Sequence, residues 1–275
     1  GFVGSHMADY LIKNCTANVF AITRWRSPTD NIKHLLSHPR IKLIEADLMD
    51  RSSLRRALQI STPDVIYHFA SQSFPGASFK VPVKTLQTNV IGTTNLLEEV
   101  KAAKDSTGRN PRIVSVSSSE VYGMPEPSDP MPIKETNPLR AANPYSISKV
   151  GHDMMSQYYH KAFGLDIVIT RMFSHEGSRR GHMFALSSFA KQIVESEIID
   201  SKNSMNREYP INHGNLNSIR TYNHIEDAVA AYWLCASGAK SGEIYNIGGD
   251  ETCTIEDALD ALISMSTISD KLVKK

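Results

Sequence analysis

The sequence contains little cysteine, almost no net charge and no long apolar run. Three cysteines in 275 residues, odd in number and widely separated, argue against a disulfide framework or a zinc site. Lysine and arginine total 30 against 29 aspartate and glutamate residues, so no extended basic surface for nucleic acid is expected. Apolar runs stay below the ~18 residues that span a bilayer. We therefore expect a cytoplasmic protein with reduced thiols, no metal, no nucleic-acid partner and no membrane partner.

Tyr145 and Lys149 lie four positions apart in the run Asn143-Pro-Tyr-Ser-Ile-Ser-Lys149. On a helix this spacing places both side chains on one face. A phenol titrates near ~10 and is a poor base at neutral pH unless a neighbouring ammonium stabilises its phenolate. The pair therefore predicts a proton-transfer site, although a solvated helix face carries the same spacing by chance.

A second group of polar side chains follows a strand-like segment. The run Arg112-Ile-Val-Ser-Val-Ser-Ser-Ser119 leads directly into Glu120. In a parallel sheet, the hydroxyls of Ser118 and Ser119 and the carboxylate of Glu120 would lie where this strand ends. Ligands of open α/β sheets bind at the carboxyl ends of the strands. Together with Tyr145, these residues predict a redox active site.

The beginning of the chain resembles a phosphate-binding turn. Gly1-Phe2-Val3-Gly4 precedes the amphipathic segment Ser5–Lys13, so a glycine turn opens a helix. The first turn of such a helix offers backbone N–H groups and a positive dipole end to a pyrophosphate. The full glycine fingerprint has one more glycine and a preceding strand, so we expect a chain truncated at its beginning. A lone Gly-x-x-Gly is also common in ordinary turns.

In combination, these residues resemble the extended short-chain dehydrogenase/reductase family over nearly the whole chain. The resemblance implies that Gly1 and Gly4 are the last two glycines of the cofactor turn. It also implies that Ser118, Tyr145 and Lys149 are the catalytic set.

Three further segments are similar to the nucleotide-sugar branch of that family, and within it to the GDP-mannose 4,6-dehydratases: Ser118–Glu120, Arg171–Gly181 and Gly214–Arg220. Two others, Phe189–Val194 and Ala231–Leu234, look as much like GDP-4-keto-6-deoxymannose reductases. Both interpretations stay open at this point.

The expected fold class is α/β, a doubly wound parallel sheet of the Rossmann type. Strand-like and helix-like segments alternate, which predicts right-handed βαβ crossovers with helices on both faces. We expect a dinucleotide-binding domain over residues 1–172. A mainly substrate-binding lobe is expected over 173–275, with segments that return to the sheet. The expected strands are Asn18–Thr23, Ile41–Glu45, Val65–His68, Ile113–Val116 and Ile167–Thr170.

Arg24 and Arg26 follow the first of these strands, where an acidic residue would favour the ribose of NAD. Guanidinium groups suit a 2′-phosphate instead, so NADP is the expected cofactor. Two solvated loop cations would give the same sequence. The other cofactor contacts are implied by the resemblance: Gly1, Phe2, Val3, Gly4, Asp47, Leu48, Phe69, Ala70, Ser71, Tyr145 and Lys149.

The substrate implied by the resemblance is a nucleotide sugar. Arginines can clamp a diphosphate through forked hydrogen bonds, while solvated surface cations are the alternative. Ser174 departs from the family pattern, which usually has an asparagine there. The expected substrate contacts are Ser119, Ser174, His175, Arg179, Arg180 and Arg220.

The activity implied is a 4,6-dehydration: oxidation at C4, elimination of water across C5 and C6, and return of the hydride to C6. Tyr145 would take the proton of the 4-hydroxyl and Glu120 the C5 proton, while Ser118 would hydrogen-bond the 4-oxygen. A reductase, an epimerase or a non-catalytic dinucleotide-binding scaffold are the alternatives. Glu120 could instead cap a helix or pair with a cation.

Asn89 resembles the asparagine of the family that supports the active-site hydrogen-bond network, although it could be an ordinary polar helix residue. The helical segments Asn89–Val100 and Tyr145–Phe163 resemble those that pair in a four-helix dimer interface. A homodimer or tetramer is therefore expected.

Overall fold

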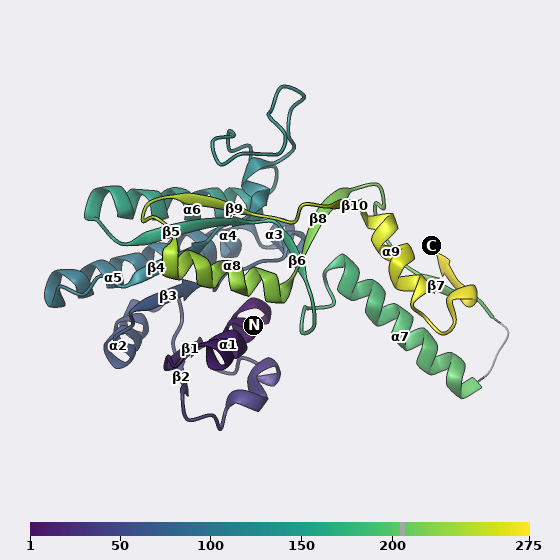
Figure 1. Ribbon diagram of the computed structural model, residues 1–275, viewed down its shortest axis with the longest axis horizontal. Helices are drawn as coiled ribbons and strands as arrows, with labels where there is room; N and C mark the ends of the chain where they lie inside the picture. Colours follow the sequence, from purple (N-terminus) through teal and green to yellow (C-terminus); the bar gives the residue numbers. More distant parts are fainter. Residues whose placement is uncertain (204–206) are drawn as a thin grey trace. The chain divides into compact units, whose positions relative to one another are not determined.

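The computed structural model describes residues 1–203 and 207–275, and the chain divides into two compact units (Figure 1). The first unit comprises Gly1–Phe173 and Ile225–Ile247. The second comprises Ser174–His224 and Gly248–Lys275. A segment late in the sequence therefore returns to the first unit.

The first unit contains all of the predicted strands, at positions that agree with the prediction to within a few residues. Its elements are α1 (Phe2–Asn14), β1 (Val19–Thr23), η1 (Asp30–Leu35), β2 (Ile41–Glu45), α2 (Arg51–Ser61), β3 (Val65–His68), α3 (Pro75–Lys80), α4 (Pro82–Leu86), η2 (Gln87–Ile91), α5 (Gly92–Thr107), β4 (Arg112–Val116), η3 (Ser119–Tyr122), α6 (Pro144–Phe163), β5 (Ile167–Met172), α8 (Ile225–Gly238) and β9 (Ile244–Ile247).

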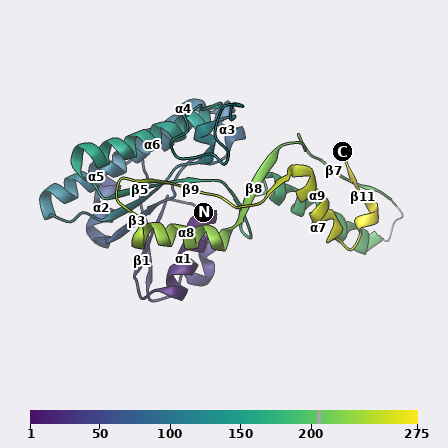
Figure 2. The same cartoon turned by 45° about the horizontal axis from the view of Figure 1, so that its top comes forward.

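The strands of this unit are parallel and are covered on both sides by helices. β3, β4, β5 and β9 form a sheet in the order β3-β4-β5-β9, and β1 pairs with β2. Helices α4, α5 and α6 lie on one face of the larger sheet, and α1 and α8 lie on the other (Figures 1 and 2). The predicted doubly wound α/β class is confirmed. The strands of this unit form two sheets, where one was expected, because β1 and β3 are not hydrogen-bonded neighbours among the described residues.

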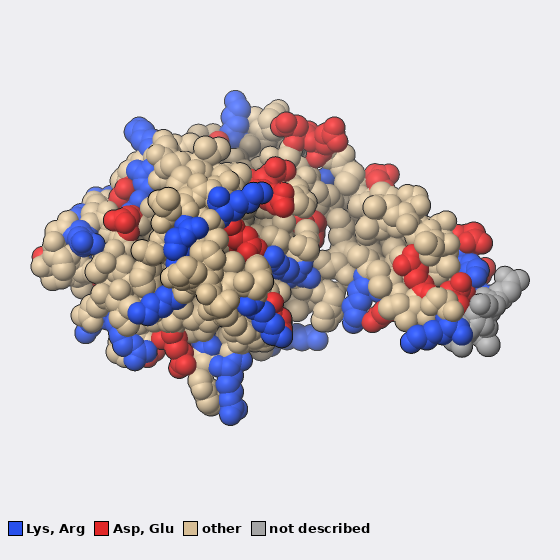
Figure 3. All heavy atoms as spheres, turned by 60° about the horizontal axis from the view of Figure 1, so that its bottom comes forward, with Lys and Arg blue, Asp and Glu red and all other residues tan. Residues whose placement is uncertain are grey.

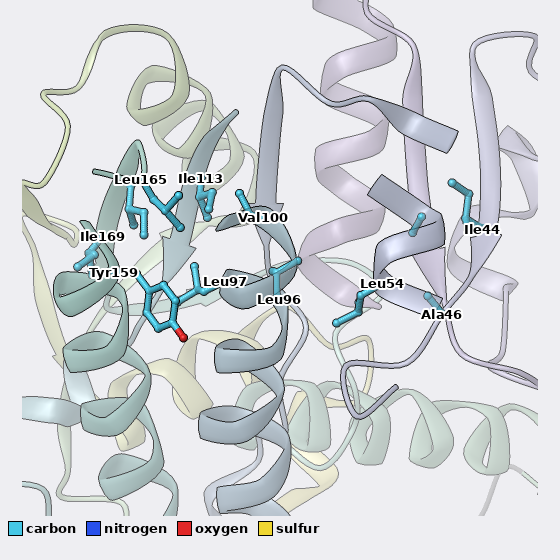
Figure 4. Packing of buried hydrophobic residues seen from close by; sticks show 12 residues of the cluster. Ile44, Ala46, Leu54, Leu96, Leu97, Val100, Ile113, Tyr159, Leu165 and Ile169 are labelled. Carbon is cyan, nitrogen blue, oxygen red and sulfur yellow. The ribbon is translucent and has the colours of Figure 1, made fainter. Parts of the chain in front are cut away.

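Burial on both faces explains why the central strands are runs of apolar residues. All six residues of β5 are buried. On the α5 and α6 side, Leu97, Val100, Ile113 and Leu165 are at most 1% exposed and pack together (Figure 4). This packed layer fixes α5 and α6 against the strands whose carboxyl ends carry the polar residues predicted to be catalytic.

The second unit has its own small core. Phe189, Ile193, Ile211 and Leu259 are buried in it at 5% exposure or less. β6 pairs in parallel and β10 antiparallel with β8, while β7 and β11 form a parallel pair. The elements are β6 (Ser174–Glu176), α7 (Ala185–Asn203), β7 (Tyr209–Ile211), β8 (Ile219–His224), β10 (Thr252–Thr254), α9 (Ile255–Ser264), η4 (Ser269–Lys271) and β11 (Leu272–Lys274).

Candidate active site

Tyr145 and Lys149 lie in the first two turns of α6. Asn143 caps this helix: its Oδ1 accepts the N–H of Ser146 at 2.8 Å, and the Ser146 hydroxyl in turn accepts the N–H of Asn143. Pro144 at the first helical position is pre-organised for this start. Both predicted catalytic side chains are buried, at 7% exposure for Tyr145 and 3% for Lys149. Tyr145 and Lys149 therefore lie on one helix, as predicted, and both side chains are buried.

The ammonium of Lys149 reaches the end of β4. Its Nζ donates to the carbonyl oxygen of Val116 at 2.8 Å. Burial lowers the pKa of Lys149 to about 8, and the negative charge of Asp153, one turn further along α6, opposes that shift. A lysine with a pKa near neutrality, beside a tyrosine, is the arrangement that proton transfer at a phenol requires.

Ser118 and Glu120 follow directly after β4, as predicted. Ser118 caps the short helix η3, and its Oγ accepts the N–H of Glu120 at 3.2 Å. The carboxylate of Glu120 accepts a hydrogen bond from Asn143 Nδ2, with 3.4 Å between the nitrogen and Oε2. The cap residue of the Tyr145 helix therefore contacts the candidate base. Sequence reasoning missed Asn143, although its position before Pro144 is a typical helix-start signal.

Asn89 is fully buried and holds two segments of the site together. Its Oδ1 accepts the N–H of Gln72 at 2.7 Å, and its Nδ2 donates to the Gln72 carbonyl and to Ser148 Oγ, each at 2.9 Å. Ser148 donates in turn to the carbonyl of Tyr145 at 2.6 Å. Asn89 lies in the π-helical turn η2, a type of distortion that is frequent at functional sites.

A chain of buried side chains lies between β3, β4, α5 and α6. Thr93 Oγ1 donates to the carbonyl of Asn89 at 2.8 Å and lies 2.8 Å from His68 Nε2 and 2.9 Å from His152 Nδ1. A hydroxyl has one proton, so both imidazole nitrogens that face Thr93 must carry theirs. His152 Nε2 is then the acceptor for Ser115 Oγ at 2.8 Å. Burial lowers the pKa of both histidines, that of His68 to about 3.

The predicted 2′-phosphate residues line a cavity of about 520 Å³ beside β1 and β2. Arg24, Arg26 and Asp47 all contribute to its wall, together with Arg56. Arg56 comes from α2, so no local sequence pattern could connect it with the other two arginines. Guanidinium groups are suited to a phosphate ester, and the carboxylates of Glu45, Asp47 and Asp50 also line the cavity, so its wall carries both signs of charge. The Trp25 ring, which is 68% exposed, stacks against Arg26 at 4.3 Å.

The remaining predicted cofactor residues lie on two loops and at the start of α1. This helix begins at Phe2 with Gly1 as its N-cap, and its first turn carries no acidic side chain that would repel a phosphate. A Cβ on Gly4 would lie 3.9 Å from the Phe69 ring, so the glycine turn is next to the loop after β3. Leu48 packs against Gly92. Ala70 is exposed and Ser71 half-buried in the loop that Asn89 holds.

The predicted substrate residues, apart from Ser119, belong to the second unit. Ser174 and His175 lie on β6, and Arg220 lies on the neighbouring strand β8. Arg180 Nε is 3.0 Å from a carboxylate oxygen of Glu176, with side chains 13% and 18% exposed. Burial raises the pKa of Glu176 to about 7, against the effect of Arg180.

The predicted basic cluster of the second unit therefore includes a carboxylate. Arg179 has a positive φ of 68°, an uncommon conformation for arginine that marks a tight turn. Figure 3 shows cationic and anionic side chains interspersed over the face that it presents.

Within residues 1–203 and 207–275, no helix is long and apolar enough to cross a membrane.

Known proteins are similar to this chain over almost its whole length. The family model described as GDP-mannose 4,6 dehydratase matches residues 1–274. GDP-mannose 4,6 dehydratase 2 of Arabidopsis thaliana is 30% identical over 94% of this chain and 68% of its own length. The dTDP-glucose 4,6-dehydratase of Salmonella typhimurium is 26% identical over 97% of this chain and 76% of its own length.

Solved structures show the same fold. DesIV, a dTDP-glucose 4,6-dehydratase from Streptomyces venezuelae with NAD and TYD bound, superposes with a TM-score of 0.84 and 27% identity, covering 100% of this chain and 81% of its own. RMD from Pseudomonas aeruginosa, complexed with NADPH, gives a TM-score of 0.77 and 25% identity over 100% and 82% of the two chains. This chain belongs to the GDP-mannose 4,6-dehydratase family, in the nucleotide-sugar branch of the extended short-chain dehydrogenases/reductases.

Proposed function

We propose that this protein is a nucleotide-sugar 4,6-dehydratase that converts GDP-mannose into GDP-4-keto-6-deoxymannose with NADP as its cofactor. The observation that carries the proposal is the contact between Glu120 and Asn143 at the start of α6. It brings a carboxylate to the helix end that presents Tyr145. A simple carbonyl reductase needs the tyrosine and the lysine, whereas elimination also needs a base for C5.

Tyr145 and Lys149 act on the 4-hydroxyl of the sugar. The phenolate of Tyr145 accepts its proton, and the ammonium of Lys149 stabilises the phenolate because the two charges are opposite. Ser118 donates a hydrogen bond to the 4-oxygen as it becomes a carbonyl. When bound, a nicotinamide would supply the redox chemistry of the reaction, which is hydride transfer at C4 and at C6.

Glu120 acts at C5. The 4-keto group makes the adjacent C5 proton acidic, and the Glu120 carboxylate removes it as a general base. The C6 hydroxyl then leaves as water with the proton that Glu120 removed, which gives a double bond between C5 and C6. After hydride addition at C6, a proton from solvent is added at C5 and completes the 4-keto-6-deoxy product. Asn143 fixes the orientation of the carboxylate during this step.

NADP is supported by three arginines that line the cavity beside β1, although Glu45, Asp47 and Asp50 line it as well. Arg24, Arg26 and Arg56 line it, and a charge-assisted hydrogen bond to a phosphate is worth about 1.5–3 kcal/mol. Arg56→Ala is expected to weaken NADP binding about tenfold or more and to leave NAD binding within about threefold. Arg109→Ala, an exposed arginine on another surface, serves as the control. Equal losses for both cofactors would assign Arg56 a structural role.

We also propose that five residues of the second unit bind the nucleotide: Ser174, His175, Arg179, Arg180 and Arg220. Arg220 is exposed, and its Nη1 donates to the carbonyl of Ile219 at 2.7 Å, which orders the guanidinium. Glu176 neutralises part of the charge of Arg180, so Arg220 is a stronger candidate than Arg180 for the diphosphate.

A cytoplasmic homodimer is the proposed state of the protein. Large exposed apolar side chains occur on α3, α4, η2 and α6, including Phe79 at 65%, Val83 at 66% and Met154 at 51% exposure. Such side chains stabilise an interface between two copies. Met154→Lys is expected to shift the mass measured by light scattering from dimer to monomer, and an unchanged mass would exclude α6 from the interface.

Incubation with GDP-mannose and catalytic NADP⁺ tests the function. A 4-keto-6-deoxy product without net cofactor reduction is expected from the wild type. Glu120→Gln should stop elimination but retain cofactor binding, while Glu126→Gln, a half-exposed glutamate in the following loop, should behave like the wild type. Elimination at the wild-type rate by Glu120→Gln would remove Glu120 from the role of base.

The same assay separates the other candidates. Stoichiometric consumption of NADPH by a supplied 4-ketosugar would identify a reductase, the second candidate. Inversion at C4 without loss of water would identify an epimerase. Cofactor binding without turnover of any nucleotide sugar would identify a non-catalytic scaffold.

A further inference from the structure

Arg171, at the end of β5, is a buried cation with partners on three segments. It is 2% exposed. Its Nε and Nη2 form a forked ion pair with Asp153 of α6, at 2.9 and 3.2 Å. Its Nη1 donates to the hydroxyl of Tyr122 at 2.9 Å and to the carbonyl of Glu135 at 2.8 Å.

These partners connect the two halves of the candidate active site. Tyr122 is the last residue of η3, two positions after Glu120. Asp153 lies on α6, four positions after Lys149, and its charge favours the protonated form of that lysine. One guanidinium therefore joins the segment that carries the base to the helix that carries the tyrosine and the lysine.

The hydroxyl of Tyr122 extends the connection to β9. It donates to Asn246 Oδ1 at 2.7 Å, and Asn246 Nδ2 donates to the carbonyl of Ile133 at 3.0 Å. The N–H of Asn246 is donated to Glu135 Oε1 at 2.7 Å. The loop between Glu120 and Tyr145 is therefore held at Ile133 by Asn246 and at Glu135 by both Asn246 and Arg171.

The geometry suits arginine and no other side chain. Asp153 is 0% exposed, so the pair carries a large desolvation cost and is sensitive to the loss of either partner. Arginine offers five N–H donors in a rigid plane, which lets one group satisfy a carboxylate and two further acceptors in different directions. A lysine would keep the charge, but it could not form the forked ion pair with Asp153 and also donate to the hydroxyl of Tyr122.

We infer that Arg171 is a positioning residue for the elimination step, acting through Tyr122 to hold Glu120 in register with Tyr145. This inference rests on the proposed function. Tyr122→Phe is the cleanest test, because it removes the bridge and leaves the Arg171–Asp153 ion pair and the bond to Glu135 in place. Arg171→Lys is the second variant. Tyr158→Phe, 53% exposed on α6, is the matched control.

Two rates measured on GDP-mannose separate positioning from general damage. The rate of C4 oxidation is followed by the absorbance of reduced nicotinamide in a single turnover, and elimination by deuterium incorporation at C5 in D₂O. For Tyr122→Phe, elimination is expected to fall about tenfold or more, since small misplacements of a catalytic group have effects of that size. C4 oxidation by Tyr122→Phe should stay within about twofold, and Tyr158→Phe should change neither rate. Arg171→Lys also loses the forked contact with Asp153, which acts on Lys149, so it is expected to lower elimination by at least as much and to lower C4 oxidation as well.

The outcomes distinguish this inference from the proposed function. Equal losses of both rates in Tyr122→Phe, or wild-type elimination in that variant, would overturn the positioning role of Arg171 while a dehydrating wild type still upholds the function. A wild-type protein that oxidises C4 but eliminates no water would overturn the proposed function, and the role of Arg171 with it.

Discussion

The side chain of Asn143 contacts Glu120 and caps the catalytic helix at the same time. Its Nδ2 lies 3.4 Å from Glu120 Oε2, and its Oδ1 accepts the N–H of Ser146 at 2.8 Å. The Asn143 amide therefore donates to the candidate base through its nitrogen and caps the start of α6 through its oxygen. Any movement of this helix end changes the position of the carboxylate.

Asn143→Ser should separate the two contacts of this side chain. Serine is a good helix cap, so stability should change by only a few tenths of a kcal/mol. The hydrogen bond to Glu120 is lost, so elimination should fall about fivefold to tenfold more than C4 oxidation. Deuterium incorporation at C5 measures the effect. Asn143→Asp, which keeps the cap and places a second negative charge beside Glu120, should be slower still. Elimination at the wild-type rate by Asn143→Ser would show that the contact between Asn143 and Glu120 has no catalytic role.

Lys149→Met should abolish turnover and raise stability at pH 7. The folded state lowers the pKa of Lys149 to about 8, below the ordinary value of about 10.4, so holding the charge opposes folding at neutral pH. After the lost bond to Val116 is counted, the expected gain is on the order of 2 kcal/mol. The wild type should recover stability relative to the variant between about pH 8 and pH 10. Urea unfolding at both pH values tests this, and a variant less stable than the wild type at pH 7 would contradict it.

His68 and His152 should make the protein sensitive to acid. Their folded-state pKa values lie below the unfolded value of about 6.5, so the unfolded chain binds more protons as the pH falls. Each histidine should cost about 1.4 kcal/mol of stability per pH unit below about 6. His68→Gln should reduce this slope in urea unfolding between pH 7 and pH 4.5, whereas the exposed His182→Gln should not. Identical slopes for all three proteins would show that these histidines do not control acid unfolding.

Gly123→Ala should disturb the segment that carries Glu120. Gly123 has a φ of 64°, and a Cβ there would lie 1.9 Å from the carbonyl oxygen of Arg140. The backbone conformation alone costs about 1–3 kcal/mol, and the collision must also move the chain. Gly108→Ala has a similar φ of 72° with open space around it, but its ψ is −4° against −142° at Gly123, so it measures the cost of a milder left-handed conformation without a collision. Thermal unfolding and the two-rate assay should show a larger loss for Gly123→Ala. Equal effects of the two substitutions would mean that neither the contact with Arg140 nor the more restricted backbone conformation of Gly123 adds to the cost.

The sequence determined those features that depend on local spacing. Tyr145 and Lys149 share a face because a helix repeats every 3.6 residues. Ser118 and Glu120 lie at a strand end because the apolar run before them is a buried strand, and parallel strands expose their carboxyl ends at one edge. The strand positions and the α/β class follow from the same periodicities, so they could be predicted without any knowledge of distant contacts.

The tertiary structure decided which residues become neighbours across long stretches of chain. Arg56 lines the same cavity as Arg24, and Arg171 reaches both Asp153 and Tyr122. Burial, which no local pattern measures, lowers the pKa of Lys149. These properties depend on the packing of α2, α6 and β5 around the strands. Desolvation and hydrogen-bond direction arise only once that packing exists, so the contacts of Arg56 and Arg171 could not be predicted from the sequence.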